Sequence, residues 1–344
     1  MKPLAALQTV AADNGIESSV TDVMAQVAQL FASGFGDIEA MLDRAAVDAP
    51  TPVDDVLAYM QDAGGKRIRP ALCLLSARAV SSEAPLPVAL ATVCELLHSA
   101  SLLHDDVIDE GDMRRGVPAA RKVWTNALSI LSGDYALMKC LEIMADFPKA
   151  YLQLLVSTLR ELVEGEIVQL GLRNSMQATE ADYFAIVNGK TSSLFHFSAL
   201  VGAMSAGAHA ETCQALGTFG RHLGTAFQLI DDVLDFDSQP QNLGKDLLAD
   251  ISQGKMTLPV ILAAERAPEM QALLTQLTMT ADVVDVAQQI SQTVRRSGAL
   301  SDVRARAAAI SQQAVEALGV LPAERAPLVR LMTQMADALL TRRR

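Results

Sequence analysis

The spacing of the apolar residues constrains the fold most, because it follows the period of an α-helix through nearly the whole chain. The pattern is clear near the start, where the apolar residues are Val20, Val23, Met24, Val27, Leu30 and Phe31. No segment shows the strict alternation of a half-buried strand, and no Asn-Gly or Asp-Gly turn joins two β-rich runs. The sequence therefore predicts an all-α fold.

Proline and glycine residues divide the chain into helices. Pro52 and the glycine pair at 64–65 bracket one helix, and a longer helix starts after Pro87 and ends at the Gly-Val-Pro of 116–118. We also expect helices over 151–172 and over about 211–236, and a capping box from Thr179 to Asp182 before a further helix. The 344 residues are 50% hydrophobic and contain no Gly/Ser-rich linker, which favours a single helical domain.

The overall charge limits the partners. A formal net charge of −12 argues against nucleic acid, whose phosphates attract basic surfaces, but it leaves room for a small anionic ligand bound by a local basic cluster. The cysteines Cys73, Cys94, Cys140 and Cys213 lack metal-site or redox spacing, which is typical of reduced thiols in a cytoplasmic protein. The weak apolar run before Asp13 does not resemble a signal peptide.

One uncharged segment is long enough to raise the question of a membrane span. Residues 191–210 carry no Lys, Arg, Asp or Glu, and that length permits a span. The segment also contains His196, His209, Gly202 and Gly207. We therefore expect a buried core helix and no membrane span.

Two acidic motifs stand out against this apolar background. The pattern Asp-Asp-x-x-Asp occurs twice, at Asp105, Asp106, Asp109 and at Asp231, Asp232, Asp235. Both motifs lie among bulky apolar residues, where unpaired carboxylates would be costly to bury. On a helix, residues i and i+4 lie one turn apart on one face, so each motif can present two carboxylates together. Clustered oxygen ligands favour a hard cation, and magnesium combines a few carboxylates with waters and phosphates. A solvated acidic face would explain one such motif better than two.

Basic residues supply the complementary charge. The loop Gly64-Gly65-Lys66-Arg67-Ile68-Arg69-Pro70 brings three cations to the start of a helix, where backbone N–H groups also favour phosphate. Arg114 and Arg115 follow the first acidic motif, and Lys190 precedes the uncharged segment. Each alone could be an ordinary surface charge, and Lys190 fits that reading least.

Together these motifs resemble the trans-polyprenyl diphosphate synthases. The matching pieces are the Gly-Gly-Lys-Arg-Ile-Arg-Pro loop, Leu-Leu-His-Asp-Asp-Val-Ile-Asp, Ser-Gly-Asp at 132–134, Gly165-Glu166 with Gln169, Lys190-Thr191, Phe227-Gln228-Leu-Ile-Asp-Asp-Val-Leu-Asp, Gly-Lys-Asp at 244–246 and Gly254-Lys255. The resemblance covers residues 53–264. It implies a helical bundle around a deep central cavity, with a catalytic domain over 46–344, a helical extension over 1–45, and a homodimer.

The resemblance also implies roles for individual residues. Magnesium would be bound by Asp105, Asp109, Asp231 and Asp235, with Asp106 and Asp232 beside them. Isopentenyl diphosphate would be bound by Lys66, Arg69, His98 and Arg115. The allylic diphosphate would be bound by Arg114, Lys190 and Lys245. Thr191 and Gln228 would place their oxygens near the developing allylic cation. No Ser-His-Asp or Cys-His nucleophile is expected.

Small residues before the first motif bear on product length. Ala100 and Ser101 are small, and in the family bulky aromatics here give short farnesyl products. The sequence therefore predicts an open tunnel and a long product, such as an octaprenyl chain for a quinone.

The alternatives to this function are a geranylgeranyl or farnesyl synthase, a terpene cyclase, a noncatalytic subunit of a heteromeric synthase and an acidic helical scaffold. We expect the terminal Arg342-Arg343-Arg344 to form a tail.

Overall fold

The computed structural model describes residues 17–237, 249–279 and 283–342. Its α-helices, in chain order, are α2 (Glu17–Leu30), α3 (Ala32–Val47), α4 (Val53–Asp62), α5 (Ile68–Val80), α6 (Val88–Ile108), α7 (Ala120–Val123), α8 (Asn126–Ala145), α9 (Lys149–Leu172), α10 (Glu180–Val187), α11 (Ser193–Ser205), α12 (Ala210–Asp237), α13 (Ala249–Ser252), α14 (Leu258–Arg266), α15 (Met270–Met279), α16 (Val283–Arg296), α17 (Ala299–Ala317) and α18 (Ala326–Thr341). One π-helical turn, η1 (Asn188–Ser192), joins α10 to α11, and 3₁₀ turns η3 (Leu318–Val320) and η4 (Ala323–Arg325) precede α18.

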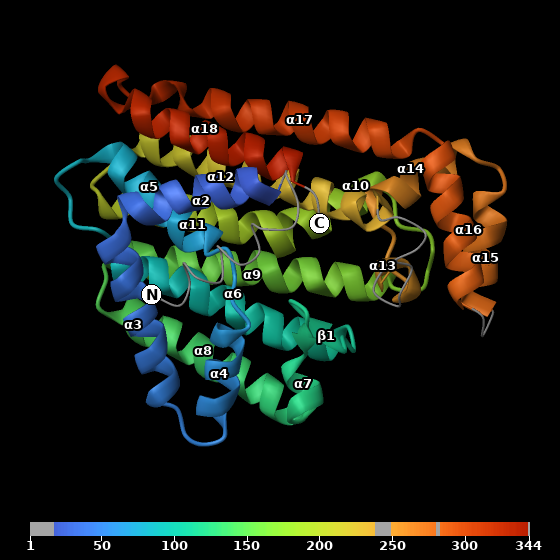
Figure 1. Cartoon of the computed structure of the whole chain (residues 1–344), viewed down its shortest axis with the longest axis horizontal. Coiled ribbons are helices and arrows are strands. Elements are labelled where there is room, and N and C mark those ends of the chain that lie inside the picture. Colours follow the sequence, from blue (N-terminus) through green and yellow to red (C-terminus); the bar gives the residue numbers. More distant parts are fainter. Residues whose placement is uncertain (1–16, 238–248, 280–282, 343–344) are drawn as a thin grey trace.

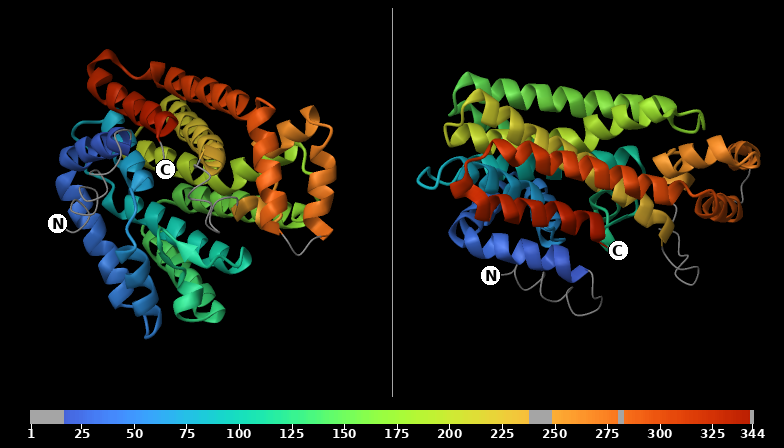
Figure 2. Two further views of the ribbon diagram at one scale, coloured as in Figure 1. Left: turned by 45° about the vertical axis from the view of Figure 1, so that its right-hand side comes forward. Right: turned by 90° about the horizontal axis from the view of Figure 1, so that it is seen from above.

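The long helices form a layered bundle (Figure 1). Helix α12 packs between α11 and α17, α11 also packs on α5, and α6 packs on α8. Seen from above in the right-hand view of Figure 2, the green α9 runs along one side of the molecule and the blue α2 along the other, with the red α17 and α18 between them. Buried apolar side chains fill the space between these layers. The expectation of an all-α, single-domain fold is confirmed.

Most helix boundaries predicted from the sequence are close to those observed. Helix α4 lies between Pro52 and Gly64, α9 and α12 fall within two residues of the expected ranges, and Thr179 and Asp182 form the capping box. The long helix after Pro87 was placed wrongly at its end, since α6 stops at Ile108.

A two-stranded hairpin follows α6 and was not predicted. β1 (Met113–Arg114) pairs with β2 (Val117–Pro118) across a two-residue turn, Arg115-Gly116. Both turn residues have positive φ, 53° and 80°, as the favoured two-residue hairpin turns require. Strands of two residues carry no alternation signal, and Arg-Gly replaces the Asn-Gly or Asp-Gly pair that would have marked the turn.

The N-terminal helices belong to the packed structure. Phe31 at the junction of α2 and α3 is 2% exposed, and Ile38 on α3 is fully buried in the main core. The division of the chain at residue 45 stays a prediction.

The uncharged segment behaves as expected: α11 is buried against α5, α9 and α12. Among the helices that the structure describes, none combines the length and apolar character needed to cross a bilayer. Cys73, Cys94 and Cys140 are buried and unpaired by disulfides.

Candidate active site

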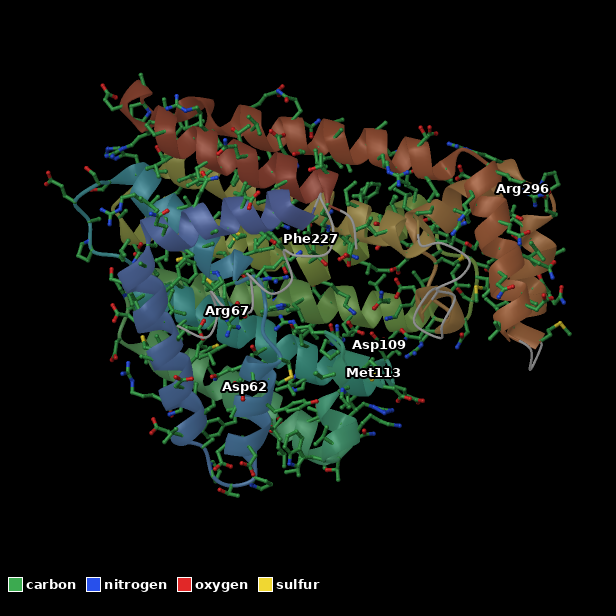
Figure 3. The ribbon with its side chains drawn as sticks, in the orientation of Figure 1. Asp62, Arg67, Asp109, Met113, Phe227 and Arg296 are labelled. Atoms are coloured by element: carbon green, nitrogen blue, oxygen red, sulfur yellow. The ribbon has the colours of Figure 1, made fainter. Side chains whose placement is uncertain are left out.

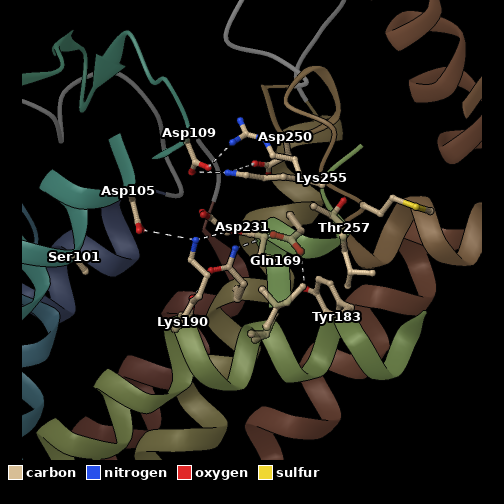
Figure 4. Close-up of a pocket in the computed structure, with 18 of the residues that line it drawn as sticks. Ser101, Asp105, Asp109, Gln169, Tyr183, Lys190, Asp231, Asp250, Lys255 and Thr257 are labelled. Carbon is tan, nitrogen blue, oxygen red and sulfur yellow. Dashed lines mark hydrogen bonds and ion pairs between the residues drawn. The ribbon is translucent and has the colours of Figure 1, made fainter. Parts of the chain in front are cut away.

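A polar cavity of about 310 Å³ opens between α6, α9, α10 and α12. Figure 3 labels two of its lining residues, Asp109 and Phe227, in the whole molecule, and Figure 4 shows the cavity itself. The predicted site residues that line it are Arg69, His98, Asp105, Asp109, Arg114, Lys190, Thr191, Gln228, Asp231 and Asp232. Segments more than a hundred residues apart in the chain therefore converge as expected.

The cavity-facing carboxylates each lie beside a side-chain cation. Asp109 accepts from Lys255 at 2.6 Å, and Asp105 lies 4.0 Å from the Lys190 ammonium. Across the cavity, Asp231 on α12 is 53% exposed. Asp105 and Asp109 are only 22% and 15% exposed. The first motif is thus the more desolvated of the two.

The pKa of Asp105 reflects this environment. Burial raises it from an ordinary value of 3.8 to about 6, Lys190 acts in the opposite direction, and Glu166 and Asp109 raise it further. A carboxylate that is costly to ionise in the protein alone would gain from a cation bound beside it.

The middle residue of each motif is turned into the protein. Asp106 is completely buried and accepts from the Arg114 guanidinium, with the Nε–Oδ1 distance 2.9 Å. Asp232 is 3% exposed and accepts from Tyr183 and Gln228. Burial raises the pKa of Asp232 well above its ordinary value, as does Asp250, while the bonds from Tyr183 and Gln228 lower it. The buried positions of Asp106 and Asp232 favour a role in holding neighbouring side chains over direct coordination of magnesium.

The basic loop uses its middle arginine as an anchor. Arg67 donates to Glu39 at 2.9 Å and to Glu95 at 2.6 Å, and Glu95 is 3% exposed. Arg67 has a φ of 49°, a left-handed conformation that a non-glycine residue keeps only when surrounding contacts hold it. Its two carboxylate partners therefore fix the loop and the start of α5.

Arg69, Arg115 and His98 form a second group of basic side chains beside this loop. Arg69 stacks on Phe195, 4.9 Å from the ring centroid, and Arg115 reaches within 3.5 Å of His98. Burial lowers the pKa of Arg69 to about 10, Glu95 opposes this, and Arg115 adds to it. Burial, then Arg69 and Arg115, lowers the pKa of His98 well below its ordinary value. A bound anion would relieve this repulsion, so the cluster fits a diphosphate.

A close approach of two helices places Lys190. A Cβ on Gly189 would lie 2.5 Å from the backbone oxygen of Glu161 and 2.9 Å from the Cα of Gly165, so only glycine fits there. This contact presses the π-helical turn against α9, and Lys190 then reaches Gln169 at 2.6 Å and pairs with Glu166. Burial lowers the pKa of Lys190, but Asp105 and Glu166 outweigh it, so the ammonium stays charged. Single-turn π segments are common at functional sites.

Other predicted residues are placed less directly. Lys66 lies in the loop before α5, and Asp235 lies one turn beyond Asp231 on α12. Lys245 falls outside the described residues. Ser101 lines the cavity, whereas Ala100 is 1% exposed and packs in a core cluster with residues of α4 and α8. The tunnel argument therefore rests on Ser101 more than on Ala100.

The C-terminus departs from the expectation of a tail. Arg342 donates to Asp231 at 2.6 Å and stacks on Phe227 at 3.9 Å from the ring centroid. It is 10% exposed, because α18 ends beside α12 and directs the side chain to the second motif. Arg343 and Arg344 lie outside the described residues.

Several residues in or next to the cavity had no role assigned from the sequence. Lys255 and Glu166 belong to two of the motifs that carry the family resemblance. Each is a charged residue directly after a glycine, and this pattern could have marked them as site residues. Arg173 bonds the backbone oxygen of Ile108 at 2.8 Å and lies 4.0 Å from Asp109. Tyr183 carries no sequence signal, because its hydroxyl partner is 49 residues away.

The residues present fit a magnesium site that is completed by substrate. Within the described ranges, no three His, Cys, Asp or Glu side chains converge tightly enough to hold an ion alone. The carboxylates of Asp105, Asp109 and Asp231 nevertheless line one cavity, together with basic side chains such as Lys190 and Lys255. Magnesium commonly takes one or two carboxylates and fills its remaining positions with phosphate and water.

A bundle of helices in which two acidic motifs share one cavity with Arg69, Arg114 and Lys190 is typical of enzymes that act on prenyl diphosphates. Comparison with known proteins gives the family. The description "Polyprenyl synthetase" matches residues 50–294. The chain therefore belongs to the polyprenyl synthetase family, and the expectation of a trans-prenyltransferase is confirmed.

Individual relatives are similar over most of their length. The all-trans-nonaprenyl-diphosphate synthase (geranyl-diphosphate specific) of Rhodobacter capsulatus is 36% identical over 88% of this chain and 92% of its own. The octaprenyl diphosphate synthase of Escherichia coli is 36% identical over 77% and 82%. The crystal structure of a Caulobacter crescentus polyprenyl synthase, complexed with calcium and isoprenyl diphosphate, has a TM-score of 0.86 at 29% identity and covers 93% of this chain and 98% of that one.

Proposed function

We propose that this enzyme joins isopentenyl diphosphate to an allylic diphosphate in a magnesium-dependent reaction and repeats the step to a long trans-polyprenyl diphosphate. The observation that carries the proposal is the convergence of Asp105, Asp109 and Asp231 with Arg69 and Lys190 on one cavity. The relatives named nonaprenyl and octaprenyl synthases support the long product.

The chain's own residues suit the two diphosphates differently. Arg69, Arg115 and His98, with Lys66 in the same loop, would hold isopentenyl diphosphate. Lys190, whose ammonium lies 4.0 Å from Asp105, would hold the allylic diphosphate with Arg114 and Lys245. Two separate anion sites are needed because both reactants are diphosphates.

Ionisation of the allylic diphosphate requires stabilisation of the departing anion. Asp105, Asp109, Asp231 and Asp235 would hold magnesium, which supplies positive charge to the diphosphate oxygens. Lys190 adds a fixed ammonium that is already charged and oriented by Glu166 and Gln169. Preoriented charge of this kind lowers the barrier without reorganisation during the reaction. The calcium in the Caulobacter crescentus complex supports a divalent ion in such a cavity.

Carbon–carbon bond formation follows ionisation. The double bond of isopentenyl diphosphate attacks the allylic cation, and a proton then leaves the new chain, with the departed diphosphate as its acceptor. Thr191 and Gln228 line the cavity and offer oxygens toward the cation. Leu102, Ile186 and Val187 in the wall exclude water, which would otherwise trap the cation as an alcohol.

Incorporation of radiolabelled isopentenyl diphosphate into extractable product, with an allylic primer, tests the reaction. We expect incorporation with magnesium and none with a chelator. Asp105→Ala and Asp231→Ala should each lower kcat by about 100-fold or more, as loss of transition-state charge stabilisation does. Asp302→Ala, in an exposed ion pair with Arg266, is the matched control and should keep full activity. Absence of incorporation with every primer would favour the noncatalytic-subunit alternative.

We also propose that the enzyme is a cytoplasmic homodimer. Two neighbouring helices expose apolar stripes: Ile130, Leu131, Met138 and Leu141 on α8, and Val156, Val163, Ile167 and Leu170 on α9. Their exposed fractions run from 39% to 62%. Exposed apolar side chains on two helices that pack together support burial of this surface against a second copy.

A further inference from the structure

A chain of hydrogen bonds runs along the cavity wall and joins three elements. Tyr183 on α10 donates to Asp232 Oδ2 at 2.5 Å, and Gln228 Nε2 donates to Asp232 Oδ1 at 2.8 Å, both acceptors lying on α12. Thr191, on the π-helical turn, donates to Gln228 Oε1 at 2.8 Å. Tyr183 lies on the inner wall in Figure 4. The chain thus links a buried phenol to two residues of the cavity surface.

The direction of each bond follows from the one before it. Because Tyr183 uses Oδ2 of Asp232, the other carboxylate oxygen is left to accept from the Gln228 amide nitrogen. The carbonyl oxygen of Gln228 must then face Thr191, whose hydroxyl hydrogen it accepts. The lone pairs of the Thr191 oxygen are left for the cavity. The oxygens of Thr191 and Gln228 therefore both retain lone pairs that can accept or interact with a positive ligand at this wall.

Burial makes this polarity hard to reverse. Asp232 is 3% exposed and Tyr183 is 4% exposed, so water cannot replace either bond. If the Gln228 amide turned over, its oxygen would meet the Asp232 oxygen and its NH₂ group would face Thr191 and the cavity. A buried polar group left against a like partner costs about 1–3 kcal/mol.

We propose that Asp232, held by Tyr183, is a positioning residue that fixes the Gln228 amide so that Gln228 and Thr191 both present oxygens to the developing allylic cation. This inference rests on the proposed function and assigns the middle aspartate of the second motif a role other than metal coordination. It also gives Tyr183 a place in the active site.

An exchange of the two side chains tests the inference. In Asp232→Asn, Tyr183 still donates to the Asn oxygen, so the Asn NH₂ opposes the Gln228 NH₂ and the Gln228 amide must turn. In Gln228→Glu, two carboxylates face each other. In the double variant Gln228→Glu with Asp232→Asn, the Asn NH₂ donates to the Glu carboxylate, whose other oxygen accepts from Thr191. In the double variant an oxygen of residue 228 again faces Thr191, and the net charge equals that of the wild type.

We expect each single variant to lower kcat by about 100-fold, as loss of an oriented transition-state contact does, with the KM for the allylic diphosphate changed less than about threefold. The exchange should recover kcat to within about tenfold of wild type, since the pair acts as a unit. Melting temperatures should follow the same order, falling in both single variants and recovering in the exchange.

The exposed pair Gln312 and Glu316 on α17 provides the matched control, because Gln312 also donates to a carboxylate four residues later, at 3.2 Å. Its exchange should leave kcat and melting temperature unchanged. If the wild type turns over but the exchange of Gln228 and Asp232 does not recover kcat, the inference is overturned. Absence of wild-type turnover would instead overturn the proposed function, and lack of recovery in melting temperature would then overturn the hydrogen-bond assignment as well.

Discussion

At the scale of single residues, the site is dominated by charges that the protein alone leaves partly uncompensated. Asp105 is buried near Asp109, and Arg69 is buried near Arg115. Each group is less stable in its charged form than it would be in water, and each would be relieved by a ligand of the opposite sign. Sequence reasoning found these residues because charges within apolar runs are conspicuous.

The buried Asp105 should lower the stability of the metal-free protein above its pKa. Its folded-state pKa of about 6 exceeds the ordinary 3.8, so its contribution is fully favourable below about pH 4 and is lost as pH rises through 6. Asp105→Asn should therefore raise the free energy of unfolding by up to about 3 kcal/mol near pH 8 and by nothing near pH 4. Urea unfolding at several pH values, in chelator, measures this. A variant less stable than wild type at every pH would contradict it.

Arg67 should matter for stability more than for charge in the cavity. Removing it leaves Glu95, 3% exposed, without its guanidinium, and breaking a buried pair typically costs about 3–5 kcal/mol. We expect Arg67→Ala to lower the free energy of unfolding by that amount in denaturant titration. Arg266→Ala breaks an exposed pair with Asp302 and should cost at most about 1 kcal/mol. Equal losses in the two variants would refute the anchoring role.

At the scale of elements, regular helices were predictable and irregular ones were not. Apolar period and capping residues located α4, α9, α10 and α12 within a few residues. The π-helical turn that carries Lys190 follows instead from contact with α9, which is tertiary information. The left-handed Arg67 likewise depends on carboxylates 28 residues away on either side. The motifs could therefore be predicted from local sequence, but the backbone conformations that orient their side chains could not.

The close contact between α9 and the π-helical turn should tolerate no side chain. Gly189→Ala would force the two backbones apart, and overpacking of this kind costs about 1–3 kcal/mol. Because Lys190 and Thr191 follow directly, kcat should fall much more than stability. Gly171→Ala, also at a helical glycine but with nothing within 4 Å, should leave kcat unchanged. Steady-state kinetics and thermal unfolding of both variants check this, and full activity in Gly189→Ala would contradict it.

At the scale of the whole molecule, the bundle exposes apolar side chains on α8 and α9, and its C-terminal helix ends beside the second acidic motif. These apolar side chains support the homodimer that the resemblance implied, while the position of Arg342 beside Asp231 could not be anticipated, because it depends on where α18 ends in space. Neither feature has a local sequence signature.

Charge placed on the exposed face should separate the subunits. Ile167 is 62% exposed, so Ile167→Asp should not disturb the fold, yet it would bury a charge in the dimer. We expect a dimer for wild type and a monomer for the variant in sedimentation velocity. Val47→Asp, at a 79% exposed valine on α3, is the control and should remain dimeric. A monomeric wild type would exclude this interface.

The most direct test of the account is the size of the product. Purified enzyme would be incubated with isopentenyl diphosphate, farnesyl diphosphate and magnesium, and the dephosphorylated products would be separated by reversed-phase chromatography. We expect a magnesium-dependent polyprenol longer than geranylgeraniol. A product that stops at geranylgeraniol would keep the reaction and contradict the long chain, and no product with any primer would contradict the proposed function itself.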